Sequence, residues 1–309
     1  MRRLGIIKLE NFVFLFASAL AFRYLCVMQK TTRYIKDSLD GLYPPEEIRA
    51  LTRILWEEVC GFSPVEVILH KDKILDESSR KKIEVIVEKL RQHEPVQYIL
   101  GHTRFGGLRF GVAPGVLIPR PETEELTALV VDENKEKRPS KIIDIGTGSG
   151  CIAITLAHHF PDCRVEGWDI SADALRIAEK NNRDLGTRVT FLQRDILHYT
   201  PPTEEHGSCD LIVSNPPYIV PSEMADMEPQ VLDHEPHTAL FVPENDPLLF
   251  YRAIAITARQ LLHPGGKLYL EINPLFASAT AGRLRAEGFG HVMIIRDLSN
   301  RERFVTATR

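Results

Sequence analysis

A glycine-rich turn is the first segment whose residue types suggest chemistry. Residues 144–150 read Asp-Ile-Gly-Thr-Gly-Ser-Gly and stand between an expected strand and an expected helix that begins near Cys151. Glycines allow a tight turn and let the backbone approach a ligand, and a helix N-terminus offers free N–H groups. A dinucleotide-binding turn, G-x-G-x-x-G, would need a glycine at Cys151. Although such turns also occur without a ligand, this one favours a small anionic or carboxylate-bearing ligand over NAD. The predicted binding residues are Asp144, Gly146, Thr147, Gly148, Ser149 and Gly150.

Acidic residues follow each of the next two expected strands. Asp169 comes 23 residues after Gly146, about where an acid hydrogen-bonds the hydroxyls of a ribose in folds of this kind. Asp195 and Ile196 follow the third strand, where they could reach an adenine; a solvated loop carboxylate is the alternative for Asp195. Together with the turn, Asp169, Asp195 and Ile196 predict an adenosine-containing ligand.

The segment Asn215-Pro216-Pro217-Tyr218 follows an apolar run at 211–213 and Ser214. It therefore lies at the carboxyl end of a strand, where the sites of α/β proteins gather. Proline stiffens the backbone and lacks an N–H group, so the carbonyls remain free to accept hydrogen bonds. The Asn215 side-chain oxygen and the Pro216 carbonyl would together bind an NH2 group, and Tyr218 would pack on a planar amide or base. We predict catalytic roles for Asn215, Pro216, Pro217 and Tyr218, and an additional cofactor contact for Asn215.

Short apolar runs that alternate with helical stretches position these residues. From residue 141 onward the runs lie at 142–145, 165–168, 189–192, 211–213, 268–272, 292–295 and 304–306. Strands separated by helices predict a mostly parallel sheet that is covered on both faces. The expected fold class is therefore α/β, with one doubly wound sheet of seven strands.

The residues before this domain show different patterns of apolar residues and glycine. In 31–92 apolar residues recur at a spacing of three or four, which predicts a small helical bundle. In 101–121 glycines alternate with apolar residues, which is typical of a short hairpin. Pro121 and the acids that follow it then predict the start of a helix. The expected organisation is an extension at 1–27, a helical domain at 28–100, a hairpin linker at 101–120 and the α/β domain at 121–309.

Charge and cysteine content narrow the possible partners. The chain has 38 Lys and Arg against 42 Asp and Glu, a formal net charge of -4, so it lacks the basic excess that phosphate binding favours. Its five cysteines are an odd number and form no C-x-x-C pair, which argues against a disulfide framework and a zinc knuckle. We expect a cytoplasmic protein with neither a nucleic-acid substrate nor a membrane partner.

The first 27 residues allow three interpretations. Basic residues precede an apolar run at 12–22, and Ala19-Leu20-Ala21 resembles the cleavage site of a signal peptide. The run is shorter than the roughly 20 residues that a spanning helix needs. Alternatively, the natural product starts at Met28 and the preceding residues are an upstream extension, or they form a packed helix. The extension is the interpretation that we favour.

The order of D-x-G-x-G-x-G, a ribose acid and N-P-P-Y resembles the S-adenosylmethionine-dependent amino methyltransferases of the seven-stranded, Rossmann-like class. In that class N-P-P-Y marks methylation of a planar NH2 group, either on adenine in a nucleic acid or on glutamine in a protein. Two upstream segments are similar to signatures of the release factor glutamine methyltransferases of the PrmC or HemK type. They are Glu-Pro-Val-Gln-Tyr-Ile-Leu-Gly at 94–101 and Leu-Ile-Pro-Arg-Pro-Glu-Thr-Glu-Glu-Leu at 117–126.

The resemblance continues at 235–236, 239–240, 262–266 and 301–304, and it covers the chain from about Met28 to its end. Two segments depart from the family pattern. Residues 1–27 have no counterpart in it, and residues 241–246 read Phe-Val-Pro-Glu-Asn-Asp where the family tends to be rich in glycine. We therefore transfer no role to residues 241–246.

The resemblance implies the donor S-adenosylmethionine and, as substrate, the glutamine of the Gly-Gly-Gln loop of a class 1 peptide chain release factor. It implies that Asn215 and Pro216 hold the NH2 group, that the glycine turn holds the methionyl part of the donor, and that Asp169 holds its ribose. We expect no metal, because the histidines are scattered without a third ligand at a suitable spacing. We also expect a monomer.

Two other functions remain open at the level of the sequence. An adenine-N6 methyltransferase acting on DNA or RNA would share the glycine turn and N-P-P-Y, but it would need an electropositive groove and a way to flip the base. A catalytically idle fold kept as a binding partner is the second alternative. The intact N-P-P-Y segment and the two upstream signatures count against both.

Overall fold

The computed structural model describes residues 28–69 and 74–309. The chain divides into two compact units, with the boundary between Leu100 and Gly101. The three interpretations of residues 1–27 lie outside the described residues.

The first unit is built from helices, as the periodicity predicts. They are α2 (Met28–Leu39), α3 (Pro45–Cys60), α4 (Pro64–Leu69), α5 (Glu77–Leu90) and α6 (Val96–Leu100). The apolar stripes of α2, α3 and α5 form its core, in which Ile35, Leu55 and Ile83 are completely buried. Helix α5 starts where the Asp76 side chain accepts a hydrogen bond from Ser79 N at 2.9 Å, because an acidic cap satisfies a free N–H of the first turn.

A hairpin opens the second unit. Strands β1 (His102–Phe105) and β2 (Leu108–Gly111) pair in antiparallel fashion. Asn181 fastens the hairpin to the α/β domain: its Oδ1 accepts from Gly111 N at 2.8 Å and its Nδ2 donates to Gly111 O at 3.0 Å. The hairpin thus packs as a part of the second unit.

The second unit is organised around one sheet of seven strands in the order β5-β4-β3-β6-β7-β9-β8. Its strands are β3 (Lys141–Ile145), β4 (Arg164–Asp169), β5 (Val189–Gln193), β6 (Cys209–Ser214), β7 (Leu262–Glu271), β8 (Gly290–Arg296) and β9 (Glu302–Thr308). Strands β3 to β7 are parallel, and β9 runs antiparallel to both of its neighbours. The chain goes from β3 outward to β4 and β5, and then returns to place β6 on the other side of β3. Ligands of open α/β sheets bind at such a reversal, outside the carboxyl ends of the strands.

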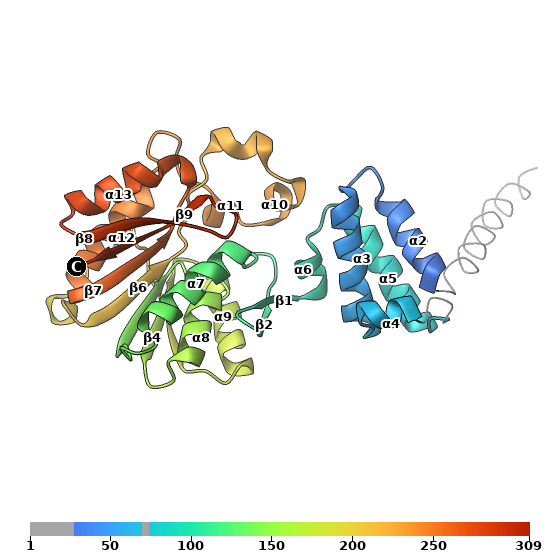
Figure 1. The fold of residues 1–309 in the computed structure, drawn as a ribbon, viewed down its shortest axis with the longest axis horizontal. Helices are drawn as coiled ribbons and strands as arrows, with labels where there is room; N and C mark the ends of the chain where they lie inside the picture. The colour runs from blue at the N-terminus through green and yellow to red at the C-terminus, as the bar shows by residue number, and fades with distance from the viewer. Residues whose placement is uncertain (1–27, 70–73) are drawn as a thin grey trace, which may run out of the picture. The chain divides into compact units, whose positions relative to one another are not determined.

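Helices cover both faces of the sheet (Figure 1). One face carries α7 (Pro121–Asn134), α8 (Cys151–His159) and α9 (Ala172–Asp184), and the other carries α12 (Leu249–Leu261) and α13 (Ala277–Ala286). Consecutive strand residues point to opposite faces: Ile142 lies in the core under α7 and α8, and Ile143 in the core under α12 and α13. Burial on both faces explains why the parallel strands read as continuous apolar runs.

Short helical segments complete the unit between these elements. They are α10 (Pro229–His234), α11 (His237–Leu240) and the 3₁₀ helices η1 (Thr203–Glu205), η2 (Pro221–Asp226) and η3 (Pro274–Phe276). All seven predicted strands are present, and the predicted α/β fold with a preceding helical part and hairpin is confirmed.

Candidate active site

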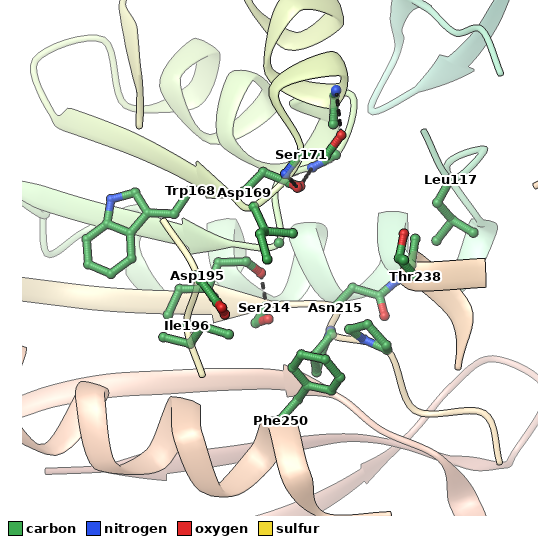
Figure 2. A pocket seen from close by; sticks show the side chains of 18 of the residues that line it. Leu117, Trp168, Asp169, Ser171, Asp195, Ile196, Ser214, Asn215, Thr238 and Phe250 are labelled. Carbon is green, nitrogen blue, oxygen red and sulfur yellow. Dashed lines mark hydrogen bonds between the residues drawn. The ribbon is translucent and has the colours of Figure 1, made fainter. Parts of the chain in front are cut away.

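A cavity of about 370 Å³ lies at the carboxyl ends of β3, β4, β5 and β6. The residues that follow each of these strands line it, together with residues before α7, around α11 and at the start of α12 (Figure 2). Among the predicted site residues, those in the lining are Gly146, Gly148, Asp169, Asp195, Ile196, Asn215, Pro216 and Pro217. The reversal of strand order thus brings together residues that are far apart in the sequence.

The glycine turn is held by its own backbone against the end of β4. Gly146 N and Thr147 N both donate to Trp168 O, at 2.8 and 2.9 Å, and Gly148 N donates to Asp169 Oδ2 at 2.8 Å. Gly148 has a φ of 54°, in the left-handed region that glycine adopts without strain. The turn therefore presents bare backbone to the cavity.

Asp144 supports the turn from behind. It is completely buried, and its Oδ2 accepts from Thr147 Oγ1 at 2.6 Å and from Ala153 N at 3.2 Å. Burial raises the pKa of Asp144 to about 7, despite these two hydrogen bonds. Asp144, Thr147, Ser149 and Gly150 are not among the residues that line the cavity. Their geometry suits them to fixing the turn and the start of α8, so their predicted cofactor contact stays a prediction.

Asp169 ends β4 and faces the cavity (Figure 2). Its Oδ2 accepts from Gly148 N, and its Oδ1 accepts from Ser171 N at 2.9 Å. Burial raises the pKa of this carboxyl, and the hydrogen bonds from Ser171 and Gly148 oppose the rise. Each carboxylate oxygen can accept a second hydrogen bond, so a pair of neighbouring hydroxyls could bind here.

Ile196 and Phe250 contribute apolar side chains to the lining, and the buried Trp168 lies behind it (Figure 2). Arg194 stacks on the indole, with its Cζ 4.2 Å from the ring centroid of Trp168. Asp195 is oriented there by Leu197 N, which donates to Oδ1 at 3.0 Å, and by a hydrogen bond with His198 that lowers its pKa. An aromatic heterocycle with a donor group fits between these side chains.

The lining therefore fits S-adenosylmethionine chemically. Apolar side chains at Ile196 and Phe250 suit an adenine, the carboxylate of Asp169 suits a ribose diol, and the bare glycine turn suits a carboxylate. The turn comes close to the N-P-P-Y segment at Gly146, because a Cβ built there would lie 3.8 Å from Asn215 O. A larger side chain at Gly146 would meet the N-P-P-Y segment.

The N-P-P-Y segment contributes three residues to the lining and one residue behind it. Asn215, Pro216 and Pro217 line the cavity, whereas Tyr218 does not. The hydroxyl of Tyr218 donates to Glu271 Oε1 at 3.0 Å, and its backbone N donates to Leu240 O at 3.2 Å. The expected packing of Tyr218 against a planar substrate stays a prediction, and its observed contacts hold the segment in place.

The sequence motifs did not predict one rim of the cavity, which consists of Val116, Leu117, Thr238 and Phe241. No role was assigned to the segment that contains Phe241. Leu117 belonged to a quoted signature, but Thr238 and Phe241 carry no residue type or spacing that predicts a site. The rim is recognisable only once the chain is folded.

A buried ion pair closes this rim. Glu235 is buried, and it accepts hydrogen bonds from Ile118 N at 3.0 Å and from the guanidinium of Arg120. It therefore joins the segment before α7 to the segment before α11. Both partners belong to the sequence signatures described above, and their contact gives those signatures a structural reason.

None of the helices in the described residues combines the length and the hydrophobicity needed to span a membrane. No three His, Cys, Asp or Glu side chains in 28–69 and 74–309 come together as a group that could hold a metal ion.

Known proteins resemble both parts of the chain. A family model described as the PrmC N-terminal domain matches residues 32–101, and one described as the methyltransferase small domain matches residues 112–233. A release factor glutamine methyltransferase of Bacteroides thetaiotaomicron is 46% identical over 282 residues, which cover 91% of this chain and 100% of the relative. Another, from Flavobacterium psychrophilum, is 38% identical over 277 residues, which cover 89% of this chain and 96% of the relative.

These matches confirm the family that the sequence motifs predicted, and they confirm a methyltransferase that uses S-adenosylmethionine. The glycine turn, the ribose acid and the N-P-P-Y segment all lie within residues 112–233, which the methyltransferase small domain model matches. The chain belongs to the release factor glutamine methyltransferase family.

Proposed function

We propose that this protein transfers a methyl group from S-adenosylmethionine to the side-chain nitrogen, N5, of the glutamine in the Gly-Gly-Gln loop of a class 1 peptide chain release factor. The observation that carries the proposal is the position of Asn215 and Pro216. They line the same cavity as Gly146 and Gly148 of the glycine turn, and a Cβ built on Gly146 would lie 3.8 Å from Asn215 O. An amide held by these two residues would lie next to the expected donor.

The residues would act on a poor nucleophile, because the lone pair of an amide nitrogen is delocalised into its carbonyl. The donor, when bound, supplies a methyl group already activated as a sulfonium. Asn215 and Pro216 would accept hydrogen bonds from the substrate NH2 and orient its nitrogen in line with the methyl group. Such placement contributes up to about 7–11 kcal/mol in favourable cases. The same acceptors would stabilise positive charge that develops on the nitrogen.

The shape of the cavity supports a loop as substrate. Its rim includes Gly115, Leu117 and Thr238 on two segments that the Arg120–Glu235 ion pair joins. A glutamine flanked by glycines could enter without side-chain clashes, because glycine has no Cβ. We propose that the helical residues 28–100 contact the body of the release factor, in line with the match of residues 32–101 to a domain model of this family.

We further propose a cytoplasmic monomer. Cys60, Cys151, Cys163 and Cys209 form no disulfide with one another, which suits a reducing compartment. Light scattering at micromolar concentration tests the monomer, and fractionation of cells with an antibody tests the compartment.

One incubation tests the reaction and its main alternative together. The purified protein is mixed with S-adenosylmethionine and either an unmethylated release factor or unmethylated DNA, and fragmentation mass spectrometry locates the added methyl group. We expect methyl on the Gly-Gly-Gln glutamine and none on DNA. Methyl on adenine with an unchanged release factor would contradict the proposed substrate while keeping the chemistry of N-P-P-Y.

A further inference from the structure

A buried carboxylate lies behind the N-P-P-Y segment, and the proposed reaction gives it no contact with a substrate. Glu271, the last residue of β7, is 1% exposed and does not line the cavity. Its two oxygens accept from two hydroxyls: Oε2 from Thr123 Oγ1 at 2.7 Å and Oε1 from Tyr218 at 3.0 Å. Burying a carboxylate is costly even when it is hydrogen-bonded, so its position calls for a reason.

The hydrogen bonds continue from Glu271 to the cavity. Asn215 Nδ2 donates to Thr123 Oγ1 at 2.9 Å, and Thr123 is itself 3% exposed. A threonine hydroxyl has one proton, and here that proton is donated to Glu271. The hydroxyl oxygen can therefore only accept from its other neighbour, so it selects the NH2 end of the Asn215 amide.

This selection decides which end of the amide faces the substrate. With Nδ2 directed at Thr123, the Oδ1 atom of Asn215 is the end left for the cavity (Figure 2). The reversed amide would place Oδ1 against the lone pairs of the Thr123 oxygen and would offer an NH2 group to the substrate NH2. Two donors cannot hydrogen-bond each other, so the reversed amide would be unproductive.

We infer that Glu271 is a positioning residue that acts through Thr123 to hold the Asn215 amide with its oxygen toward the nitrogen to be methylated. The inference rests on the proposed function, because it assumes that the substrate presents an NH2 group. It assigns a role to Thr123, the buried threonine of the 117–126 segment, which does not itself line the cavity.

The end of β7 also fixes the backbone of the same segment. Asn273, two residues after Glu271, donates from Nδ2 to Tyr218 O at 3.1 Å and to Glu223 Oε2 at 2.8 Å. Tyr218 is thus held at its hydroxyl by Glu271 and at its carbonyl by Asn273. These contacts restrain the position of the N-P-P-Y segment, while the Thr123 contact restrains the orientation of the Asn215 amide.

The network favours an ionised Glu271. The carboxylate fits this network best, because both of its oxygens accept, whereas a protonated carboxyl adds a hydrogen for which neither hydroxyl is placed as an acceptor. Burial raises the pKa of Glu271 to about 7, although the two hydrogen bonds lower it. The pKa of this carboxyl is affected by Thr123, Tyr218, Arg303 and Glu122, and its charge in turn raises the pKa of Tyr251.

Steady-state methylation of the release factor by matched threonine variants tests the inference. Thr123→Val removes the hydroxyl at constant shape, and Thr123→Ser keeps it. We expect Thr123→Val to lower kcat by about tenfold to a hundredfold. This effect is larger than the loss of one neutral hydrogen bond would give and no larger than the loss of a group that contacts the transition state would give. Thr123→Ser should restore most of that rate, and the affinity for S-adenosylmethionine should stay unchanged in both variants.

Thr127→Val is the control for packing. Thr127 is a buried threonine one turn further along α7, and its hydroxyl donates to Thr123 O at 2.9 Å rather than to the network. We expect its kcat to stay within about twofold of wild type, because the Thr127 hydroxyl bonds only the backbone carbonyl of Thr123 and leaves the Thr123 hydroxyl unchanged. A loss in Thr127→Val as large as that in Thr123→Val would overturn the inference in favour of a packing effect.

A double-mutant cycle with Asn215→Ala shows whether Thr123 acts by orienting the Asn215 amide or by stabilising the surrounding fold. If Thr123 acts only through Asn215, Thr123→Val should lower kcat no further once Asn215 is alanine. Additive losses in the double variant would overturn the inference. If wild type instead methylates adenine, the proposed substrate is wrong, and the same cycle run on that amine decides about the network separately.

The pH dependence of kcat is the test of Glu271 itself. We expect the wild-type kcat to fall as the pH decreases from about 8 to about 6, as the carboxyl gains its proton, and Glu271→Gln to lose this step. A wild-type profile that is flat over this range, or the same step in the variant, would refute a requirement for ionised Glu271.

Discussion

Replacing Asp169 by alanine tests how the cavity holds its cofactor. Asp169 joins β4 to the glycine turn, because its two oxygens accept from Gly148 N at 2.8 Å and Ser171 N at 2.9 Å. The remaining lone pairs face the cavity, where we propose that they accept from the two ribose hydroxyls. Asp169→Ala removes all of these acceptors together, while the surrounding strand and helix keep their own packing.

The expected magnitude follows from the hydrogen bonds that are lost. A hydrogen bond to a charged group contributes about 1.5–3 kcal/mol, and two would contribute about 3–6 kcal/mol if they were additive. Because Asp169 lies at a partly open cavity, where water competes for its oxygens, we take the lower limit of about 3 kcal/mol. That corresponds to an increase in Kd of about a hundredfold.

Titration calorimetry with S-adenosylmethionine measures this change, and circular dichroism checks that the variant folds. Asp173→Ala is a matched control: it removes the same charge four residues later, at an exposed position where Asp173 pairs with Arg176. We expect the control to bind as wild type does. A Kd for Asp169→Ala within about twofold of wild type would refute the assignment of the ribose to this carboxylate, since two hydrogen bonds cannot contribute so little.

Three further predictions concern the substrate, the turn and the rim. Asn215→Ala should lower kcat by about a hundredfold or more and leave cofactor affinity near normal; unchanged turnover in the methylation assay would contradict its role. Gly150→Ala should cost about 2–4 kcal/mol in urea unfolding, because Gly150 has a φ of 81° and a Cβ would lie 2.9 Å from Ile154 Cδ1. Gly186→Ala, with a φ of 67° but open space around it, should cost about 1–2 kcal/mol; an equal cost at both positions would exclude the close contact as the cause. Arg120→Met should cost about 2–3 kcal/mol of stability by leaving buried Glu235 without its cation, a loss reduced by the partial exposure of Arg120. Adding Glu235→Gln should recover part of that stability, and a further loss instead would argue against the ion pair.

Local patterns were sufficient to predict the secondary structure of the α/β domain. The seven strands appear where apolar runs stood between helical stretches, because strands buried on both faces must be apolar throughout. The helix α7 begins at Pro121, whose missing N–H group costs nothing in a first turn. The glycine turn was equally local, since its conformation depends on three glycines with positive φ, Gly146, Gly148 and Gly150, within seven consecutive residues.

The order of strands and the partners of buried polar groups are not local properties. Asp169, Asp195 and Asn215 meet at one cavity because β6 lies on the opposite side of β3 from β4. The motif order suggested this arrangement only through resemblance to a known family. Residue spacing alone does not state which strands are neighbours.

By itself, the sequence determined the elements, the glycine turn and the acceptor-rich N-P-P-Y segment, since each of these depends on residues that are close together in the chain. Only the tertiary structure decided that Tyr218 turns its hydroxyl to Glu271 and that Thr123, 148 residues before Glu271, hydrogen-bonds the same carboxylate. It also decided that Phe241 lines the cavity. The physical reason is that a buried polar group must find a partner wherever the fold provides one, and that partner is set by the packing of distant segments.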